Sequence, residues 1–150
     1  MKKIEKIKIG FCFIKATEGD ERVDNRFETN WNKAKENNIP RGAYHFFDPE
    51  KSGAVQAQNF IKNVQIGKGD LPPVLDVEQL NGVSIVDLQQ RVGEWLQLVE
   101  AHYKVKPLIY TGADFYKRNL MSKFDEYPLW VAHYFIKDKP RIQRSWVFWQ

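Results

Sequence analysis

The sequence predicts an α/β fold built on a parallel sheet, and three observations support this prediction. Short apolar segments alternate with longer segments of helical periodicity along the chain, which is typical of parallel strands joined by crossover helices. Polar residues follow the ends of the apolar segments. In a parallel sheet such residues lie at the carboxyl edge, where we expect the functional site. The chain of 150 residues supplies about six strands, whereas a closed eight-stranded barrel typically needs about 250 residues, so an incomplete barrel is expected.

Each expected element is supported by its residue pattern and by a boundary signal. In the first helix Phe27, Trp31 and Ala34 share one face at the spacing of an amphipathic helix. Ser52 and Ser84 are suitable amino-terminal caps for the next two helices. In chain order we expect a strand at residues 11–16, a helix at 25–38, a strand at 42–47, a helix at 52–64, a strand at 74–78, a helix at 84–103, a strand at 107–111, a helix at 112–121, and strands at 129–134 and 146–150.

Composition excludes several classes of protein. The length corresponds to a single domain over residues 1–150. The net charge of +4 is modest, and Lys and Arg alternate with Asp and Glu, so a nucleic-acid partner is not expected. No segment approaches membrane-spanning length, and the charged amino terminus lacks the apolar core of a signal peptide. Cys12 has no disulfide partner, and the three histidines show no metal-ligand spacing, so no metal or other cofactor is expected.

Residues 71–78 carry the strongest functional signal. A pair of prolines leads into an apolar run that ends in two acids, Asp76 and Glu78. Side chains two apart on a strand share a face, so both carboxyls should point the same way. Two carboxyls at the end of a buried strand suit acid catalysis at a glycosidic bond. The alternative is that these acids end a strand and face water. Their expected separation of roughly 5 to 8 Å leaves retention and inversion both open.

Further motifs accompany this pair along nearly the whole chain, at residues 13–19, 24–31, 42–47, 56–60, 75–78, 109–112, 129–134 and 148–150. In this order and spacing they resemble the family-25 glycoside hydrolases, lysozymes that cleave peptidoglycan between N-acetylmuramic acid and N-acetylglucosamine. The resemblance implies a flattened TIM-like (β/α) barrel and a bacteriolytic 1,4-β-N-acetylmuramidase that needs no cofactor. It also implies peptidoglycan as the partner and the cell wall or extracellular space as the place of action.

The resemblance implies a role for each matching residue. Glu78 matches the general acid, which needs a raised pKa that a partly buried site beside a charged Asp76 would provide. Asp76 matches the acid that orients the substrate's 2-acetamido group or stabilises positive charge at the anomeric centre. Glu18 matches a further acid that lines the cleft, with a solvated loop acid as the alternative. The expected walls of the sugar groove are Tyr44, Tyr110, Trp130 and Tyr134, of which Tyr44 and Trp130 could instead be core residues.

Two segments of the family pattern have no match in this chain. They are a first strand with an Asp-x-Ser-like segment and a final strand with another Asp. The resemblance therefore implies a partial catalytic domain, truncated at both ends, whose open strand edges favour self-association. Two functions stay open: hydrolysis by this chain itself, and a catalytically weak or inactive fragment that binds cell-wall glycan or pairs with the missing strands.

Overall fold

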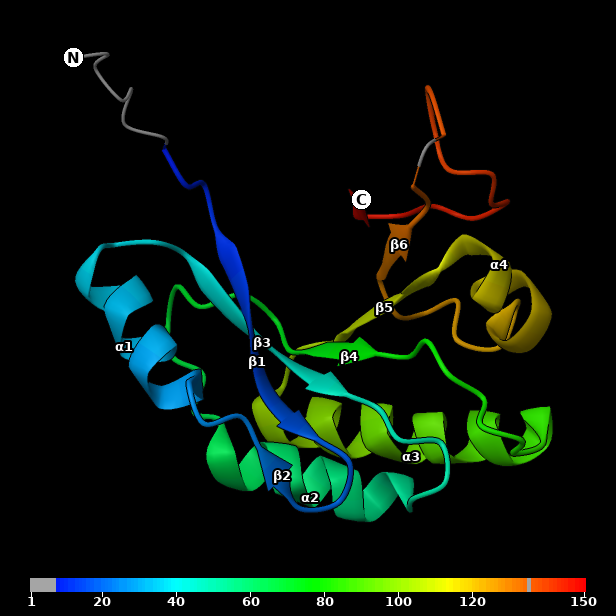
Figure 1. Cartoon of the computed structure of the whole chain (residues 1–150), viewed down its shortest axis with the longest axis horizontal. Helices are drawn as coiled ribbons and strands as arrows, with labels where there is room; N and C mark the ends of the chain where they lie inside the picture. The colour runs from blue at the N-terminus through cyan, green and yellow to red at the C-terminus, as the bar shows by residue number, and fades with distance from the viewer. Residues whose placement is uncertain (1–7, 135) are drawn as a thin grey trace.

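A seven-stranded sheet forms the frame of the protein, and its helices cover one face of that sheet (Figure 1). The computed structural model describes residues 8–134 and 136–150. Neighbouring strands follow the order β2-β1-β3-β4-β5-β6-β7, and all pairs are parallel except β1 with β2. The strands are β1 (Cys12–Glu18), β2 (Arg22–Val23), β3 (Arg41–Phe46), β4 (Val74–Asp76), β5 (Leu108–Gly112), β6 (Leu129–Ala132) and β7 (Phe148–Trp149).

The helices confirm the predicted order, with shorter bounds. They are α1 (Phe27–Glu36), α2 (Gly53–Asn63), α3 (Ile85–Tyr103) and α4 (Ala113–Phe115), the last continued by the π-helical turn η1 (Tyr116–Leu120). The two predicted caps are confirmed, because Ser52 accepts a hydrogen bond from the Val55 N–H at 3.4 Å and Ser84 accepts one from the Asp87 N–H at 3.1 Å. Such caps satisfy N–H groups that have no partner within the helix.

Two features of the sheet differ from the prediction. Strand β2 was not predicted, because its two exposed residues carry no periodic pattern. It forms because the chain turns back at Gly19, which has a φ of 58°, and pairs with the end of β1. The strand expected at residues 74–78 ends at Asp76. The Val77 N–H still donates to the Tyr110 carbonyl at 2.9 Å, but Glu78 lies beyond the sheet.

The sheet is strongly curved. β1 and β6 are four strand spacings apart in the sheet order, which would be roughly 19 Å in a flat sheet. Nevertheless, the ring centroids of Phe13 in β1 and Trp130 in β6 are 4.9 Å apart. Phe148 of β7 joins this contact, 5.3 Å from Phe11 and 6.1 Å from Phe13. These rings therefore lie on the concave face of the sheet. Within the described residues the sheet does not close, so the fold is an incomplete TIM-like barrel.

The hydrophobic core lies on the opposite, convex face, between the sheet and the helices. In Figure 1, α2 and α3 run beneath the sheet. Trp95 of α3 is fully buried and packs 5.4 Å from the ring of Phe60 of α2. Burying an aromatic or aliphatic side chain of this kind contributes roughly 2 kcal/mol. Because the core occupies the convex face, the concave face is left to carry other residues.

Candidate active site

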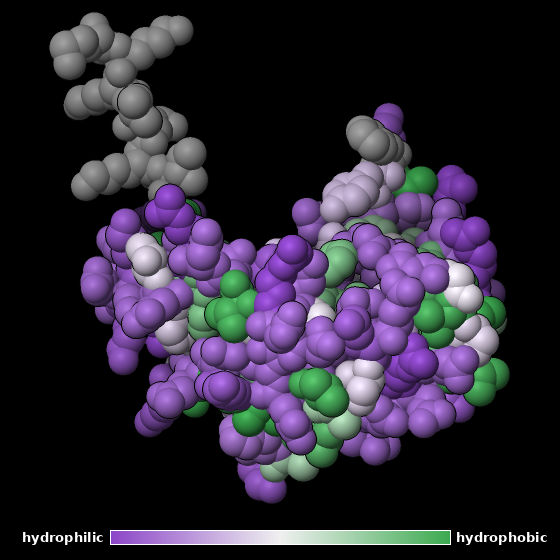
Figure 2. All heavy atoms as spheres, turned by 60° about the horizontal axis from the view of Figure 1, so that its bottom comes forward, coloured by the Kyte–Doolittle hydropathy of each residue, from purple (hydrophilic) through white to green (hydrophobic). Residues whose placement is uncertain are grey.

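Strand register brings four of the seven predicted site residues into one row across the concave face. Residues paired across neighbouring strands point to the same side of a sheet. The carboxyl ends of the parallel strands also meet at one edge, where catalytic residues of barrel enzymes lie. In register from β1 to β7, the row consists of Glu18, Phe46, Asp76, Tyr110, Trp130 and Phe148. Figure 2, in which the helix-covered side comes forward, shows a notch in the upper outline of the molecule.

Asp76 is the buried acid of the row. It ends β4 with an exposed fraction of 8%, and its Oδ1 atom has no hydrogen-bond partner among the described residues. Burial raises the pKa of Asp76 to about 8, and the negative charge of Glu78 adds to this rise. The positive charge of Lys15 opposes this change. At neutral pH Asp76 is therefore the protonated member of a carboxyl pair.

The placement of Glu78 corrects the prediction. We expected a partly buried, protonated Glu78 beside a charged Asp76. Instead, Glu78 is exposed, and the acid with the raised pKa is Asp76. The physical reason is that β4 ends at Asp76, which stays enclosed between β3 and β5, while the chain carries Glu78 out of the sheet. Glu78 nevertheless remains close enough for its negative charge to raise the pKa of Asp76.

The raised pKa of Asp76 predicts how stability depends on pH. The folded protein keeps a proton that the unfolded chain releases above the ordinary pKa of 3.8, so the free energy of unfolding falls as pH rises from about 4 to about 8. Asp76→Asn has no carboxyl to titrate at this position, so its free energy of unfolding should not fall in this pH range for this reason. We expect the variant to be more stable than wild type by about 5 kcal/mol at pH 8, and nearly equal to it at pH 4.

Urea unfolding at both pH values tests this prediction. Asp114→Asn is the matched control, because Asp114 is exposed on α4 and its substitution should give no difference that grows with pH. A gain from Asp76→Asn of the same size at pH 4 and at pH 8 would contradict the proposed titration.

Glu18 is more than a solvated loop acid. Its carboxylate forms ion pairs with Lys15 at 2.6 Å and with Arg22 at 2.8 Å. The hydrogen bond from Lys15 is the largest cause that lowers the pKa of Glu18, and Arg22 adds to it. Residues three apart on a regular strand point to opposite faces. The register shift between Lys15 and Thr17 brings Lys15 and Glu18 to the same face.

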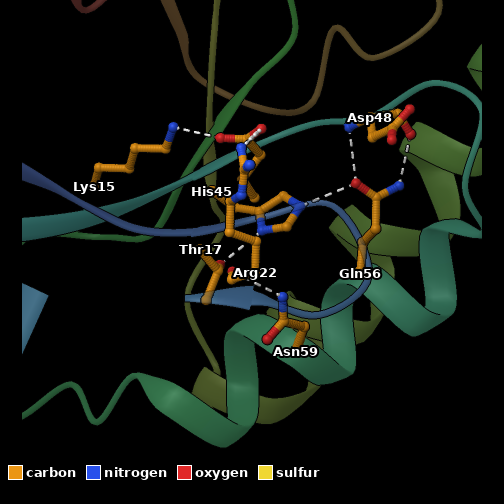
Figure 3. Close-up of polar contacts among 8 residues, drawn as sticks. Lys15, Thr17, Arg22, His45, Asp48, Gln56 and Asn59 are labelled. Atoms are coloured by element: carbon orange, nitrogen blue, oxygen red, sulfur yellow. Dashed lines mark hydrogen bonds and ion pairs between the residues drawn. The ribbon is translucent and has the colours of Figure 1, made fainter. Parts of the chain in front are cut away.

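Helix α2 supports the loop that follows Glu18. The side-chain amide of Asn59 donates to the carbonyl of Gly19 at 3.1 Å and to the carbonyl of Arg22 at 3.2 Å, as Figure 3 shows in part. Asn59 is 8% exposed. This role of Asn59 was not predicted, although a buried polar residue beside Phe60 on the apolar side of a helix is a recognisable signal.

A second polar network links β1, β3 and α2 on the convex side. His45 is fully buried, with one ring nitrogen 2.7 Å from the Thr17 hydroxyl and the other 3.1 Å from the Gln56 side-chain oxygen (Figure 3). Gln56 also binds the backbone N–H and carbonyl of Asp48 at 2.9 and 2.8 Å. Burial lowers the pKa of His45 to about 4, so this histidine is neutral and structural. The network anchors the loop after β3.

The tyrosines of the predicted groove lie near the carboxyls. Tyr44 is half-buried, and its pKa is raised by burial and then by the nearby charges of Asp76, Asp24, Glu78 and Glu18. The hydroxyls of Tyr110 and Tyr134 are 3.2 Å apart, and burial raises the pKa of Tyr110. Tyr134 is 55% exposed. Asp24 also lies near this site. It belongs to the motif at residues 24–31 but was not predicted as a site residue.

Trp130 lies inside an aromatic cluster and is not a free-standing wall. Its ring meets Phe13 at 4.9 Å, Tyr110 at 4.8 Å and Phe148 at 5.8 Å. The alternative of a packing role is therefore supported, with the packing on the concave face. Within the described ranges, no group of three or more His, Cys, Asp or Glu residues is arranged to hold a metal ion.

A separate hollow of about 1060 Å³ lies between α1, the end of α2 and the loop at residues 65–70. Its buried charge, Arg41, is already paired with Asp70 at 2.9 Å and lies 3.9 Å from the centre of the Trp31 ring. These partners give Arg41 a structural role. The interacting acid pair lies on the concave face, which makes that face the stronger candidate site.

Known proteins of similar sequence include a lysozyme and an uncharacterized protein. Lysozyme M1 of Streptomyces globisporus is 35% identical over 159 residues, which cover 95% of this chain and 53% of that protein. An uncharacterized protein, YegX of Escherichia coli, is 47% identical over 144 residues, which cover 96% of this chain and 53% of YegX. The chain thus spans about half the length of these relatives.

Solved structures share the fold. A family 25 glycosyl hydrolase from Bacillus anthracis superposes with a TM-score of 0.88 at 34% identity, covering 94% of this chain and 67% of that one. The bacterial lysozyme of Streptomyces coelicolor gives a TM-score of 0.82 at 32% identity, covering 94% and 72%. The sequence profile described as Glycosyl hydrolases family 25 matches residues 1–150. The chain therefore belongs to glycosyl hydrolase family 25.

Proposed function

We propose that this chain hydrolyses peptidoglycan at the β-1,4 bond between N-acetylmuramic acid and N-acetylglucosamine. The observation that carries the proposal is the buried carboxyl of Asp76 at the carboxyl edge of the sheet, with the exposed Glu78 two residues further along the chain. The family, and the relatives named lysozyme, narrow the substrate to cell-wall glycan. Action on that polymer places the chain at the cell wall or outside the cell.

Glu78 is proposed as the general acid, because it is the exposed member of the pair and can reach a bound sugar. A sugar that covers Glu78 removes its water, which raises the proton affinity of that carboxylate. The pair's proton then passes to the glycosidic oxygen as the bond from that oxygen to the anomeric carbon breaks. Water supplies the hydroxyl that ends on the anomeric carbon, and the remaining proton of that water returns to the pair.

Asp76 is proposed as the orienting and stabilising carboxylate. Once the pair has released its proton, the buried carboxylate lies close to the positive charge that develops at the anomeric centre. Glu18, held by Lys15 and Arg22, is proposed to accept hydrogen bonds from the substrate. The proposed sugar contacts are the ring or hydroxyl of Tyr44, Tyr110, Trp130 and Tyr134.

A second candidate function is glycan binding without cleavage, or pairing with further strands. It is favoured by the sheet edges, which have no further strand partner among residues 8–134 and 136–150 and where apolar side chains are exposed: Phe11 is 47%, Trp146 40% and Val147 54% exposed. Exposed edges also favour self-association of the chain. No helix in the described part of the chain is both long enough and apolar enough to cross a bilayer.

The two functions are separated by incubating the purified chain with insoluble peptidoglycan. Hydrolysis predicts a fall in turbidity together with new reducing ends on muramic acid. Binding alone predicts that the chain sediments with the polymer and that no reducing ends appear. Sedimentation velocity over a range of protein concentrations measures self-association separately. Absence of both turbidity loss and co-sedimentation would overturn both candidates.

A further inference from the structure

The charges on the concave face are unequally distributed. Four carboxyls lie near the hydroxyl of Tyr44, namely those of Asp76, Asp24, Glu78 and Glu18, and all of them except Asp76 are negative charges. Against them stand two cations from the described residues, Lys15 of β1 and Arg22 of β2. The uncharged titratable groups that face this site are the hydroxyls of Tyr44, Tyr110 and Tyr134. A surplus of negative charge of this kind makes any nearby cation influential.

Lys15 is placed between the acids. Its ammonium lies 2.6 Å from Glu18 and 5.1 Å from the centre of the Phe46 ring. Phe46 is in register with Glu18 on one side and with Asp76 on the other. The ammonium therefore lies over the ring that separates Glu18 from the acid pair, and its positive charge acts on Asp76.

The β-bulge of β1 is what gives Lys15 this position. Without the register shift between Lys15 and Thr17, Lys15 and Glu18 would point to opposite faces. The Lys15 side chain is 32% exposed, compared with 71% for Arg22. The charge of Lys15 is consequently less screened by solvent than that of Arg22. If Lys15 only packed against Phe46, an uncharged side chain would do so without the cost of removing an ammonium from water. The charge of Lys15 therefore serves the neighbouring acids.

We propose that Lys15 is a positioning residue of this site: its ammonium holds the Glu18 carboxylate and, lying over Phe46 between Glu18 and Asp76, places a positive charge beside the buried acid. This inference rests on the proposed function for its catalytic meaning. Its electrostatic content concerns the acid pair itself and can be measured without any substrate.

The experiment is a ¹³C NMR titration of the Asp76 carboxyl in the wild-type chain and in Lys15→Met. Loss of the positive charge should raise the titration midpoint of Asp76 by about 0.5 to 1 pH unit, a three- to tenfold change in proton affinity. Lys15→Arg keeps the charge and should restore the midpoint. Arg22→Gln is the matched control, because Arg22 contacts the same Glu18 but is exposed, and it should move the midpoint less.

Activity gives a second, separate readout. If the chain hydrolyses peptidoglycan, Lys15→Met should move the pH profile of reducing-end release to higher pH, because both the pair and Glu18 then hold their protons more tightly. A purely structural role would lower the melting temperature or the rate without moving the profile or the midpoint. That result would overturn the inference.

Failure of the two proposals can be distinguished. If the wild-type chain does not hydrolyse peptidoglycan but the Asp76 titration midpoint still rises in Lys15→Met, the proposed function is wrong and the inference about Lys15 stands. If the chain hydrolyses peptidoglycan but the Asp76 midpoint is the same in Lys15→Met and wild type, the inference about Lys15 is wrong and the proposed function stands. Should Lys15→Met fail to fold, Lys15→Gln, which keeps a polar side chain, is titrated in its place with the same expected rise.

Discussion

Glu78→Gln should reduce the release of reducing ends from peptidoglycan at least ~100-fold, while the fold remains intact. Glutamine matches glutamate in shape but cannot deliver a proton to the glycosidic oxygen. Glu78 is exposed after the end of β4, so its substitution breaks no core contact. Its removal also takes a negative charge away from Asp76, which should lower the titration midpoint of Asp76.

The measurement compares initial rates of reducing-end release at several pH values, together with thermal unfolding. Glu36→Gln is the matched control, because Glu36 is an exposed glutamate at the end of α1 and should retain the wild-type rate. A folded Glu78→Gln chain that hydrolyses at the wild-type rate would remove Glu78 from the role of general acid.

Gly53→Ala should destabilise the protein by about 3 kcal/mol or more. Gly53 is the first residue of α2, and a β-carbon added there would lie 1.9 Å from the carbonyl oxygen of Arg91 and 2.7 Å from its carbonyl carbon. Both atoms belong to the backbone of α3, so neither can rotate away. The two helices would have to separate, and their contact buries Phe60 against Trp95.

Chemical unfolding of Gly53→Ala and of Gly93→Ala checks this prediction. Gly93 lies within α3, and a β-carbon there would meet Phe124 at 3.6 Å, an ordinary van der Waals distance. Because alanine favours a helix interior over glycine by about 1 kcal/mol, Gly93→Ala should be neutral or slightly stabilising. Equal stability of Gly53→Ala and wild type would mean that α2 and α3 can move apart at little cost.

The order of elements could be predicted from local pattern, because each element leaves a periodic or capping signal. Helices α2 and α3 begin directly after Ser52 and Ser84 as predicted. Strand β2 and the π-helical turn η1 were missed. The first is too short to show a pattern, and helical periodicity does not distinguish an α-helical turn from a π-helical one.

The candidate site was predicted in its residue types and in part of its geometry. The register places Glu18, Asp76, Tyr110 and Trp130 on one face of the sheet, while their roles as site residues stay predictions. The state of the acid pair was predicted the wrong way round, with the raised pKa on Glu78. Two acids one residue apart look equivalent in a sequence, and only the surrounding strands decide which of them loses its water.

Local sequence patterns were sufficient to predict the alternation of strands and helices, the capped helix starts and the two acids near a strand end, since these features depend on neighbours within a few residues. Tertiary structure alone decided that Asp76 is buried while Glu78 is exposed, that a bulge brings Lys15 beside Glu18, and that Phe13 meets Trp130 across a curved sheet. The physical reason is that desolvation, charge proximity and curvature arise from residues far apart in the chain, whose distances no local pattern encodes.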